Sequence, residues 1–252
     1  MFNQDPDPAF FDTTKTCVDG TSLGSWWAKR GKSKDYRPDQ PQLVVGVVMR
    51  RDGIPIACEI WPGNTADVKT VMPVIEGVEK RSRIRRVGLV CDRGIVSREN
   101  LRQIDKAGYQ YIVGIKIRGF VEVRDEVLSR EGRYGEVDES EALQVKGVWV
   151  EDRRYVICLN PEEAKKDRHD REAILEKIRN KPASGSGRRV KVLINNRGYK
   201  RFLKIERAKI GIDEDKVRDD ARYDGKYVLR TTAELPAAEV APAYRHLTWI
   251  ER

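Results

Sequence analysis

Histidine is nearly absent from this chain of 252 residues, which contains only His169 and His246. Both lie in charged or polar stretches, and no nucleophile-elbow motif is close to either of them. This scarcity argues against a serine–histidine triad and against a metal site built from several histidines. Any metal ion would have to be held by carboxylates.

Cysteine is scarce as well. Its four occurrences include no Cys-x-x-Cys pair, which argues against a disulfide framework and against a zinc site. Three of the four lie inside apolar runs typical of strands, so we expect small buried hydrophobic side chains there. The four residues are Cys17, Cys58, Cys91 and Cys158.

Long apolar runs and the residue pattern of a secretory signal are also missing from this sequence. The longest run, Leu43–Met49, is far shorter than the ~20 residues that span a bilayer. Residues 1–8 lack the basic-then-apolar pattern of a signal peptide. Lys and Arg number 49 against 40 Asp and Glu, which gives a net charge of +9. We therefore expect a soluble, basic protein with one large domain or two small ones.

The first half of the chain alternates strand and helix patterns. Strands are predicted at Phe10–Val18, Leu43–Met49 and Ile54–Trp61, and the Asp-Gly pair at 52–53 predicts a hairpin between the last two. A helix from Thr70, a buried strand at Val87–Cys91, a helix from Ser97 to Gly108 and a strand at Tyr111–Ile117 follow. The order β-β-β-α-β-α-β predicts a mixed α/β sheet.

The second half has shorter strand patterns separated by charged turns, and it reads as an insertion or second lobe. Strands are predicted at Val145–Val150, Arg154–Leu159, Val190–Ile194 and Tyr227–Thr231. Helices are predicted at Pro161–Asn180 and, after Pro242, within Leu235–Arg252.

Two aspartates stand at strand positions suited to chemistry. Asp92 directly follows the buried strand Val87–Cys91, at the sheet edge where ligands of open α/β sheets bind. Asp12 lies inside a strand pattern, where a carboxylate is disfavoured unless a cation, a donor or a metal compensates it. If the two strands are neighbours, a hard cation such as Mg²⁺ would relieve the repulsion between the carboxylates. Glu251 is a candidate third ligand on the last helix.

Basic residues form three clusters, at 29–37, at 80–86 and at 188–207, and the last carries eight cations against one acid. A solvated charged surface would explain each cluster, but three of them in one chain favour a polyanion such as DNA. The neighbouring Trp26 and Trp27 are either base-stacking residues or packing residues that anchor a loop.

Several segments together resemble the DDE-type insertion-sequence transposases, which have an RNase H-like catalytic core. The resemblance runs in order along nearly the whole chain. It is carried by residues 11–14 (FDTT), 32–42 (KSKDYRPDQPQ), 61–67 (WPGNTAD), 91–94 (CDRG), 196–203 (NRGYKRFL), 224–229 (DGKYVL) and 249–252 (WIER).

The resemblance implies a catalytic domain over residues 8–252. Its RNase H-like core would occupy 8–117 and 224–252, and a mostly β insertion, 118–223, would precede the helix that bears the glutamate. It also implies that Asp12, Asp92 and Glu251 are the catalytic acids and that they hold two Mg²⁺ or Mn²⁺ ions. These ions would serve phosphodiester cleavage and strand transfer.

The implied partners are the ends of the insertion sequence, the target DNA and a second copy of the chain, as a homodimer in a synaptic complex. The implied location is the cytoplasm, in association with the nucleoid. Lys32, Lys34, Arg37 and Arg93 are the candidate DNA contacts.

The sequence departs from the branch with the Tyr-Arg-Glu-Lys signature. Tyr244 stands seven positions before Glu251 as the signature requires, but Leu247 takes the arginine position and the lysine position falls beyond residue 252. An N-terminal DNA-binding domain would also be missing. We therefore expect a fragment cut at both ends that is weakly active or inactive, because Glu251 would stand on a fraying helix end.

Two other hypotheses stay open. One is a non-catalytic, DNA-binding transposase remnant that competes with the intact enzyme, and the other is a different RNase H-like nuclease such as a junction resolvase.

Overall fold

The computed structural model describes residues 7–18, 26–31, 37, 39–50, 52–82, 87–138, 141–180, 195–206 and 209–249. The chain divides into two compact units. Unit 1 consists of Met1–Gly135, Val145–Ile157 and Val228–Arg252, and unit 2 consists of Glu136–Gln144 and Cys158–Tyr227.

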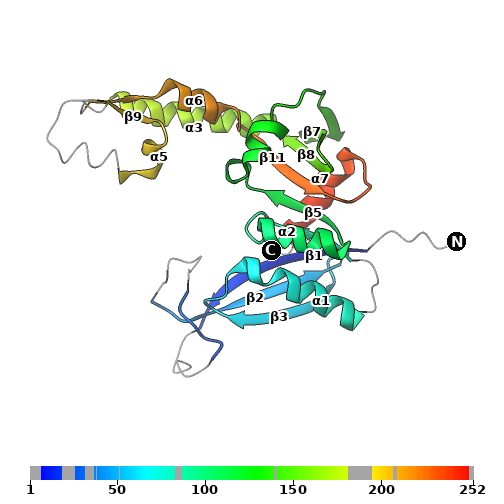
Figure 1. The fold of residues 1–252 in the computed structure, drawn as a ribbon. Coiled ribbons are helices and arrows are strands. Elements are labelled where there is room, and N and C mark those ends of the chain that lie inside the picture. Colours follow the sequence, from blue (N-terminus) through cyan, green and yellow to red (C-terminus); the bar gives the residue numbers. More distant parts are fainter. Residues whose placement is uncertain are drawn as a thin grey trace. The chain divides into compact units, whose positions relative to one another are not determined.

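The first part of unit 1 has the predicted order of strands and helices (Figure 1). Its elements are β1 (Asp7–Cys17), β2 (Gln42–Met49), β3 (Pro55–Pro62), the short η2 (Asp67–Lys69), α1 (Val71–Ser82), β4 (Val87–Cys91), α2 (Arg98–Ala107) and β5 (Gln110–Ile115).

Local sequence signals account for the limits of these elements. Gly53 adopts a left-handed φ of 80° in the hairpin between β2 and β3, as the Asp-Gly pair predicts. Ser97 caps α2 by accepting a hydrogen bond from the Asn100 N–H at 3.1 Å, and Gly108 ends the helix at a φ of 75°. β1 begins at Asp7, three residues before the predicted start.

The large sheet is mixed, as predicted. In the described residues its strand order is β3-β2-β1-β4-β5-β11-β8-β7-β6. β1 lies antiparallel to β2 and parallel to β4, β4 is parallel to β5, and β5 is antiparallel to β11 (Lys226–Thr231). β1 and β4 are therefore neighbours although their paired residues are 80 positions apart in the sequence.

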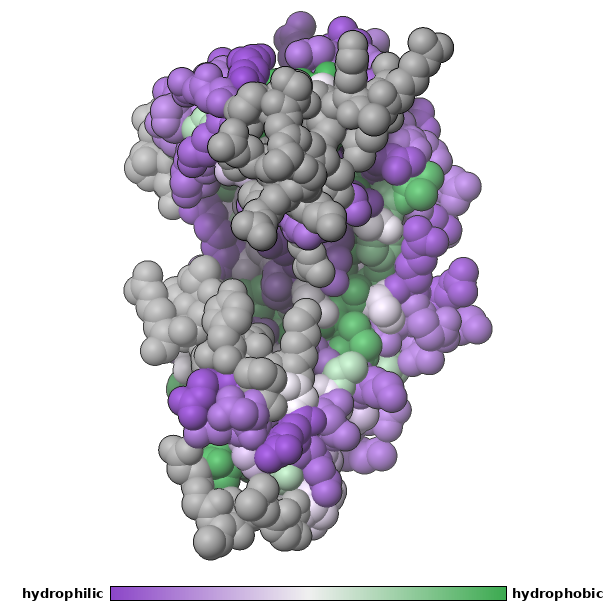
Figure 2. Space-filling view, turned by 90° about the vertical axis from the view of Figure 1, so that its left-hand side faces the viewer, coloured by the Kyte–Doolittle hydropathy of each residue, from purple (hydrophilic) through white to green (hydrophobic). Residues whose placement is uncertain are grey.

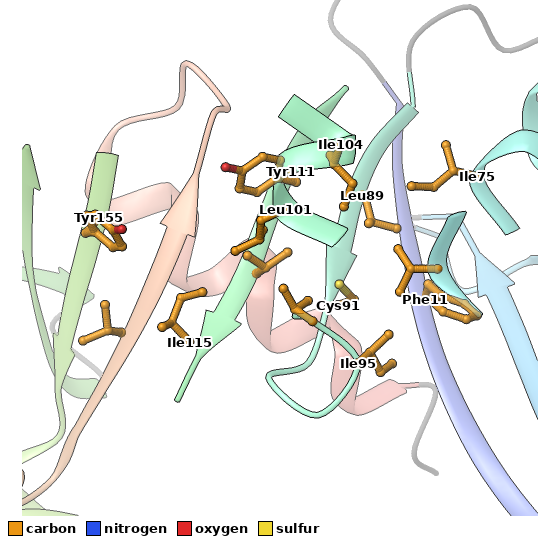
Figure 3. Close-up of a cluster of buried hydrophobic side chains, with 14 of the residues drawn as sticks. Phe11, Ile75, Leu89, Cys91, Ile95, Leu101, Ile104, Tyr111, Ile115 and Tyr155 are labelled. Carbon is orange, nitrogen blue, oxygen red and sulfur yellow. The ribbon is translucent and has the colours of Figure 1, made fainter. Parts of the chain in front are cut away.

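One face of this sheet carries the main hydrophobic core. Phe11, Leu89, Cys91 and Tyr111 point from successive central strands into a cluster that includes Ile75 and other residues of α1 and α2 (Figure 3). Residues Tyr111–Ile115 are all buried, as expected for a central strand covered on both faces. The core thus holds β1, β4 and β5 in one rigid layer.

The later elements of the chain complete unit 1 and build unit 2. They are η3 (Ile117–Gly119), η4 (Val123–Val127), β6 (Gly135–Asp138), β7 (Glu141–Val150), β8 (Arg153–Leu159), α3 (Pro161–Arg179), α5 (Arg197–Lys200), β9 (Leu203–Glu206), β10 (Lys209–Ile212), α6 (Glu214–Ala221), β11, α7 (Ala237–Arg245) and η5 (His246–Trp249).

Two predictions for this part are wrong. The region 118–223 is not mostly β in the described residues, because α3, α5 and α6 contribute about as many residues as β6–β10. The last helix does not follow Pro242 but begins at Ala237 and contains that proline. The burial of Val240 and Ala241 offsets the hydrogen bond that Pro242 cannot make. The predicted strand Val190–Ile194 lies outside the described residues.

Unit 2 has a small core of its own. Leu175 and Ile178 of α3 pack with Phe202 and Leu203, and Val217 of α6 joins them. Figure 1 shows α3, α6 and β9 together in this unit. Unit 2 therefore contains a small helix-and-hairpin cluster rather than a β layer.

One face of the molecule is mostly polar. The described residues on the face drawn in Figure 2 are mostly hydrophilic, with apolar residues in smaller patches. This agrees with a charged content of 35%. Among the described residues, no helix is both long and apolar enough to cross a membrane.

The cysteine prediction is partly wrong. Cys91 and Cys158 are buried, but Cys17 is half-buried and Cys58 is exposed. Cys58 lies on β3, the edge strand of the sheet, where one face of the strand is open to solvent.

Candidate active site

The two predicted aspartates lie next to each other at the end of the pairing between β1 and β4. The last paired residues of these strands are Phe11 and Cys91, and Asp12 and Asp92 are the next residues along each strand. Because the strands are parallel, both chains leave this pair in the same direction. The register thus brings together two carboxylates that are separated by 80 positions in the sequence.

Both aspartates belong to the sheet face opposite the main core. Phe11 and Cys91 belong to the core cluster, so the alternation of side chains assigns Asp12 and Asp92 to the other face. α7 and η5 pack on this second face, where the rings of Phe10 and His246 lie 5.8 Å apart. The site is therefore bounded by the last helical segment of the described chain.

Asp92 is held by a tyrosine and by its own turn. The Tyr244 hydroxyl on α7 donates to Asp92 Oδ1 at 2.9 Å, and the Gly94 N–H donates to Oδ2 at 3.2 Å. The backbone of Ile95 closes the turn by donating to the Asp92 carbonyl at 3.2 Å. These contacts fix the carboxylate just beyond the end of β4.

Asp12 is held by its neighbour in the strand. The Thr13 N–H donates to Asp12 Oδ1 at 2.7 Å. A carboxylate has about four lone-pair positions, so it can accept hydrogen bonds and bind a cation at the same time. Hard oxygen ligands of this kind suit Mg²⁺ or Mn²⁺. Among the described residues, however, no group of three or more His, Cys, Asp or Glu side chains gathers for a metal.

The site surrounds a glycine of β5. A Cβ on Gly114 would lie 2.5 Å from the Tyr244 hydroxyl oxygen and 3.1 Å from the backbone nitrogen of Arg93. Only glycine leaves room at this position for the phenol and for the turn after Asp92.

The local electrostatics keep two neighbouring groups protonated. Burial raises the pKa of the Cys91 thiol well above its usual value, and the charges of Asp92 and Asp12 raise it further. Burial, followed by the charge of Asp92, raises the pKa of Tyr244 in the same way. Cys91 is therefore a neutral buried side chain rather than a thiolate ligand, and Tyr244 is a permanent donor at neutral pH.

The remaining predicted residues have different positions. Arg93 is exposed in the turn beside Asp92. Arg37 is exposed as well, and its Nε lies 3.6 Å from Asp39 Oδ1. Lys32, Lys34 and Glu251 lie outside the described residues.

The sequence alone did not identify two residues of this site, Tyr244 and Gly114, as functional. Tyr244 was noted only for its spacing to Glu251, and that spacing was the available signal for it. The signal for Gly114 was a glycine inside the apolar strand pattern Tyr111–Ile117, which often marks a close approach.

Comparison with known protein families gives a match over most of the chain. A family model described as the transposase DDE domain matches residues 10–246. The match begins in β1, two residues before Asp12, and ends at the start of η5, two residues after Tyr244. No curated protein sequence matches the chain.

Proposed function

Because the chain belongs to the family of transposase DDE domains, we propose that Asp12 and Asp92 hold the divalent metal ions for cleavage and strand transfer at insertion-sequence ends. Members of the family act in DNA transposition as nucleases and transferases, bind DNA and generally use divalent metal ions. The observation that supports the proposal is the register that makes the two aspartates neighbours.

The chain's own residues would divide the work. Asp12 and Asp92 would bind the metal, Tyr244 would orient Asp92, and the exposed Arg93 would neutralise a DNA phosphate. When bound, Mg²⁺ or Mn²⁺ would supply an activated water and stabilise the charge on the leaving oxygen. Glu251 is the proposed third ligand, because it follows Trp249 by two residues, a span of at most ~7 Å, and η5 packs on β1.

The same proposal covers the finer fold and the partners. We assign the elements β1–β5 and α7 to an RNase H-like core, and residues 118–223 to an insertion. Unit 2 contains only part of that insertion, because residues 118–135 and 145–157 belong to unit 1. The proposed substrates are the ends of the insertion sequence and the target DNA, and a homodimer would hold two ends together. Lys32, Lys34 and Arg37 stay candidate DNA contacts.

A nicking experiment tests the catalytic proposal. The purified chain is incubated with duplex DNA that carries the ends of the insertion sequence, with Mg²⁺, with Mn²⁺ or with EDTA. As the departures from the family signature predict, we expect metal-dependent nicking to be weak. Asp12→Asn and Asp92→Asn should each reduce it at least ~100-fold or below detection, because removal of a carboxylate ligand removes the metal's transition-state stabilisation.

Calorimetry separates this proposal from a non-catalytic remnant. The unaltered chain should bind Mn²⁺, and Asp92→Asn should weaken that binding, while the affinity for DNA in EDTA stays the same. Mn²⁺ binding that does not depend on Asp12 or Asp92, or nicking that survives both substitutions, would refute the assignment. DNA binding without either metal binding or nicking would favour the competing remnant.

A further inference from the structure

Two adjacent tryptophans form an exposed aromatic surface outside the aspartate site. The rings of Trp26 and Trp27 have centroids 3.7 Å apart and are tilted by 34°. The side chain of Trp26 is 60% exposed, and Trp27 is half-buried. Exposure of one ring does not by itself require a ligand, since Trp149 is exposed as well, so the inference depends on the paired rings and on their charged surroundings.

The segment that carries the two rings is firmly attached to the sheet. Lys29 and Gln42 exchange backbone hydrogen bonds of 3.2 and 3.0 Å, and the Trp27 carbonyl accepts from the Gly63 N–H at 3.1 Å. The buried Gln42 side chain donates from Nε2 to the Gly63 carbonyl at 3.1 Å. A Cβ on Gly63 would overlap the carbonyl oxygens of Gln42 and Lys29, so glycine is required for this close packing. The exposed rings therefore have a rigid base, which lowers the entropy cost of binding.

The surroundings of the rings are positively charged. Lys29 and Arg30 are exposed, and residues 26–31 contain no acidic side chain. Interfaces between proteins are enriched in tryptophan and arginine but depleted in lysine, whereas sites for single-stranded nucleic acid combine both kinds of cation with aromatic rings on which bases stack. The composition of this surface thus favours a nucleic-acid strand over a protein partner.

The strand β1 connects this surface to the aspartates. Gln42 pairs with Cys17 at the end of β1, and Cys17 lies five residues after Asp12, which corresponds to roughly 17 Å along the strand. Gln42 in turn pairs with Lys29, so the segment with the two rings lies beyond this end of β1, and a DNA strand that follows β1 from the aspartates would run toward it.

From this geometry we infer that Trp26 and Trp27 are a stacking platform for an unpaired base of DNA, with Lys29 and Arg30 holding the adjacent phosphates. The inference rests on the proposed function for its biological setting, but it concerns a different surface. It predicts a preference for single-stranded over double-stranded DNA that depends on Trp26.

Fluorescence anisotropy with a labelled oligothymidine and with a duplex of the same length tests the inference. Trp26→Ala should weaken binding of the single strand about 5- to 150-fold, as expected for the loss of one stacked base, and should leave duplex binding unchanged. Trp26→Tyr, which keeps a ring, should recover most of the affinity. Trp149 is the matched control, because it is 63% exposed but is followed by Glu151 and Asp152. Trp149→Ala should bind both DNAs like the unaltered chain.

Three results would overturn the platform. The first is that Trp26→Ala and Trp149→Ala bind the single strand with equal affinity. The second is that Trp26→Ala loses single-strand and duplex binding to the same extent. The third is that Trp26→Ala alone changes the oligomeric state, measured by light scattering. The last would identify the rings as a contact between copies. The same comparison in the Asp92→Asn variant, with EDTA present, keeps the test independent of catalysis. In that variant Trp26→Ala should still weaken single-strand binding, whether or not nicking is ever observed.

Discussion

A single hydrogen bond links the phenol of Tyr244 to the carboxylate of Asp92 across 152 positions of sequence. The other hydrogen bond to this carboxylate comes from the Gly94 N–H of its own turn, at the longer distance of 3.2 Å. A hydrogen bond to a charged acceptor contributes about 1.5–3 kcal/mol, and here it also restricts the rotamer of a proposed metal ligand. Tyr244 is therefore a positioning residue for the site.

Tyr244→Phe should lower metal-dependent nicking about 10- to 100-fold and weaken Mn²⁺ binding, because Asp92 loses the donor that orients it. Tyr155→Phe is the matched control. The Tyr155 hydroxyl donates to Glu122 Oε1 at 2.8 Å, a hydrogen bond that involves neither Asp12 nor Asp92. Both variants lose a phenol–carboxylate bond, so similar losses of stability are expected. If the two variants bind Mn²⁺ and nick DNA equally well, Tyr244 has no positioning role.

Gly114→Ala should disturb the same site by steric overlap. The new Cβ would lie 2.5 Å from the Tyr244 hydroxyl in a central strand, so the phenol or the strand must shift. Overpacking of this kind costs about 1–3 kcal/mol, measured as the change in the free energy of unfolding by urea titration. Gly135→Ala, at a strand glycine with open space around it, should change stability by less than ~1 kcal/mol. Equal effects of the two substitutions would show that the close approach has no energetic consequence.

At the scale of strands and helices, periodicity and turn residues were enough to predict the order from β1 to β5. Cap signals such as Ser97 and Gly108 gave the limits of α2. The pairing of β1 with β4 could only be hypothesised from the sequence, because register depends on contacts between residues distant along the chain. The start of α7 was mispredicted for a related reason, since the burial of Val240 and Ala241 against the sheet outweighs the local penalty of Pro242.

An ion pair that the sequence did not reveal joins α3 to the turn before β11. Arg171 is only 7% exposed and donates to both carboxylate oxygens of Asp224, at 2.5 and 2.7 Å, with Asp220 at 3.7 Å. The hydrogen bond to Asp224 is the main reason why the pKa of Arg171 is raised. The pair therefore ties two elements of unit 2 that are 53 positions apart.

Asp224→Ala should destabilise unit 2 by about 3–5 kcal/mol, because Arg171 would keep a buried charge without its bidentate partner. Asp215→Ala breaks the exposed pair of Asp215 with Arg218 on α6 and should cost less than ~1 kcal/mol. Both changes are measured by urea unfolding, with protease cleavage within residues 158–227 as the readout of unfolding. Comparable losses for the buried and the exposed pair would contradict the role given to Arg171.

At the scale of the whole molecule, the net charge of +9 leaves the location of DNA binding open. Many described cations are already paired with acids one helical turn away, as Lys165 and Lys166 are with Glu162 and Glu163. Lys29 and Arg30 stand in a described segment without any acidic residue. Composition alone therefore predicted the class of ligand, whereas the structure distinguishes cations by their surroundings.

The salt dependence of single-strand binding can separate total charge from local charge. A protein that neutralises Z phosphates of a single strand gives a slope of about −0.7Z in a plot of log K against log salt. If Lys29 and Arg30 each contact a phosphate, the double variant Lys29→Ala/Arg30→Ala should make the slope less steep by about 1.4.

The control Lys165→Ala/Lys166→Ala also removes two positive charges, but from a solvated helix face. It should therefore weaken binding only slightly and leave the slope unchanged. Anisotropy titrations across a range of salt concentrations measure both variants. If the two double variants change the slope equally, DNA responds to the overall charge of the chain, and the segment 26–31 has no special part in binding the phosphate backbone.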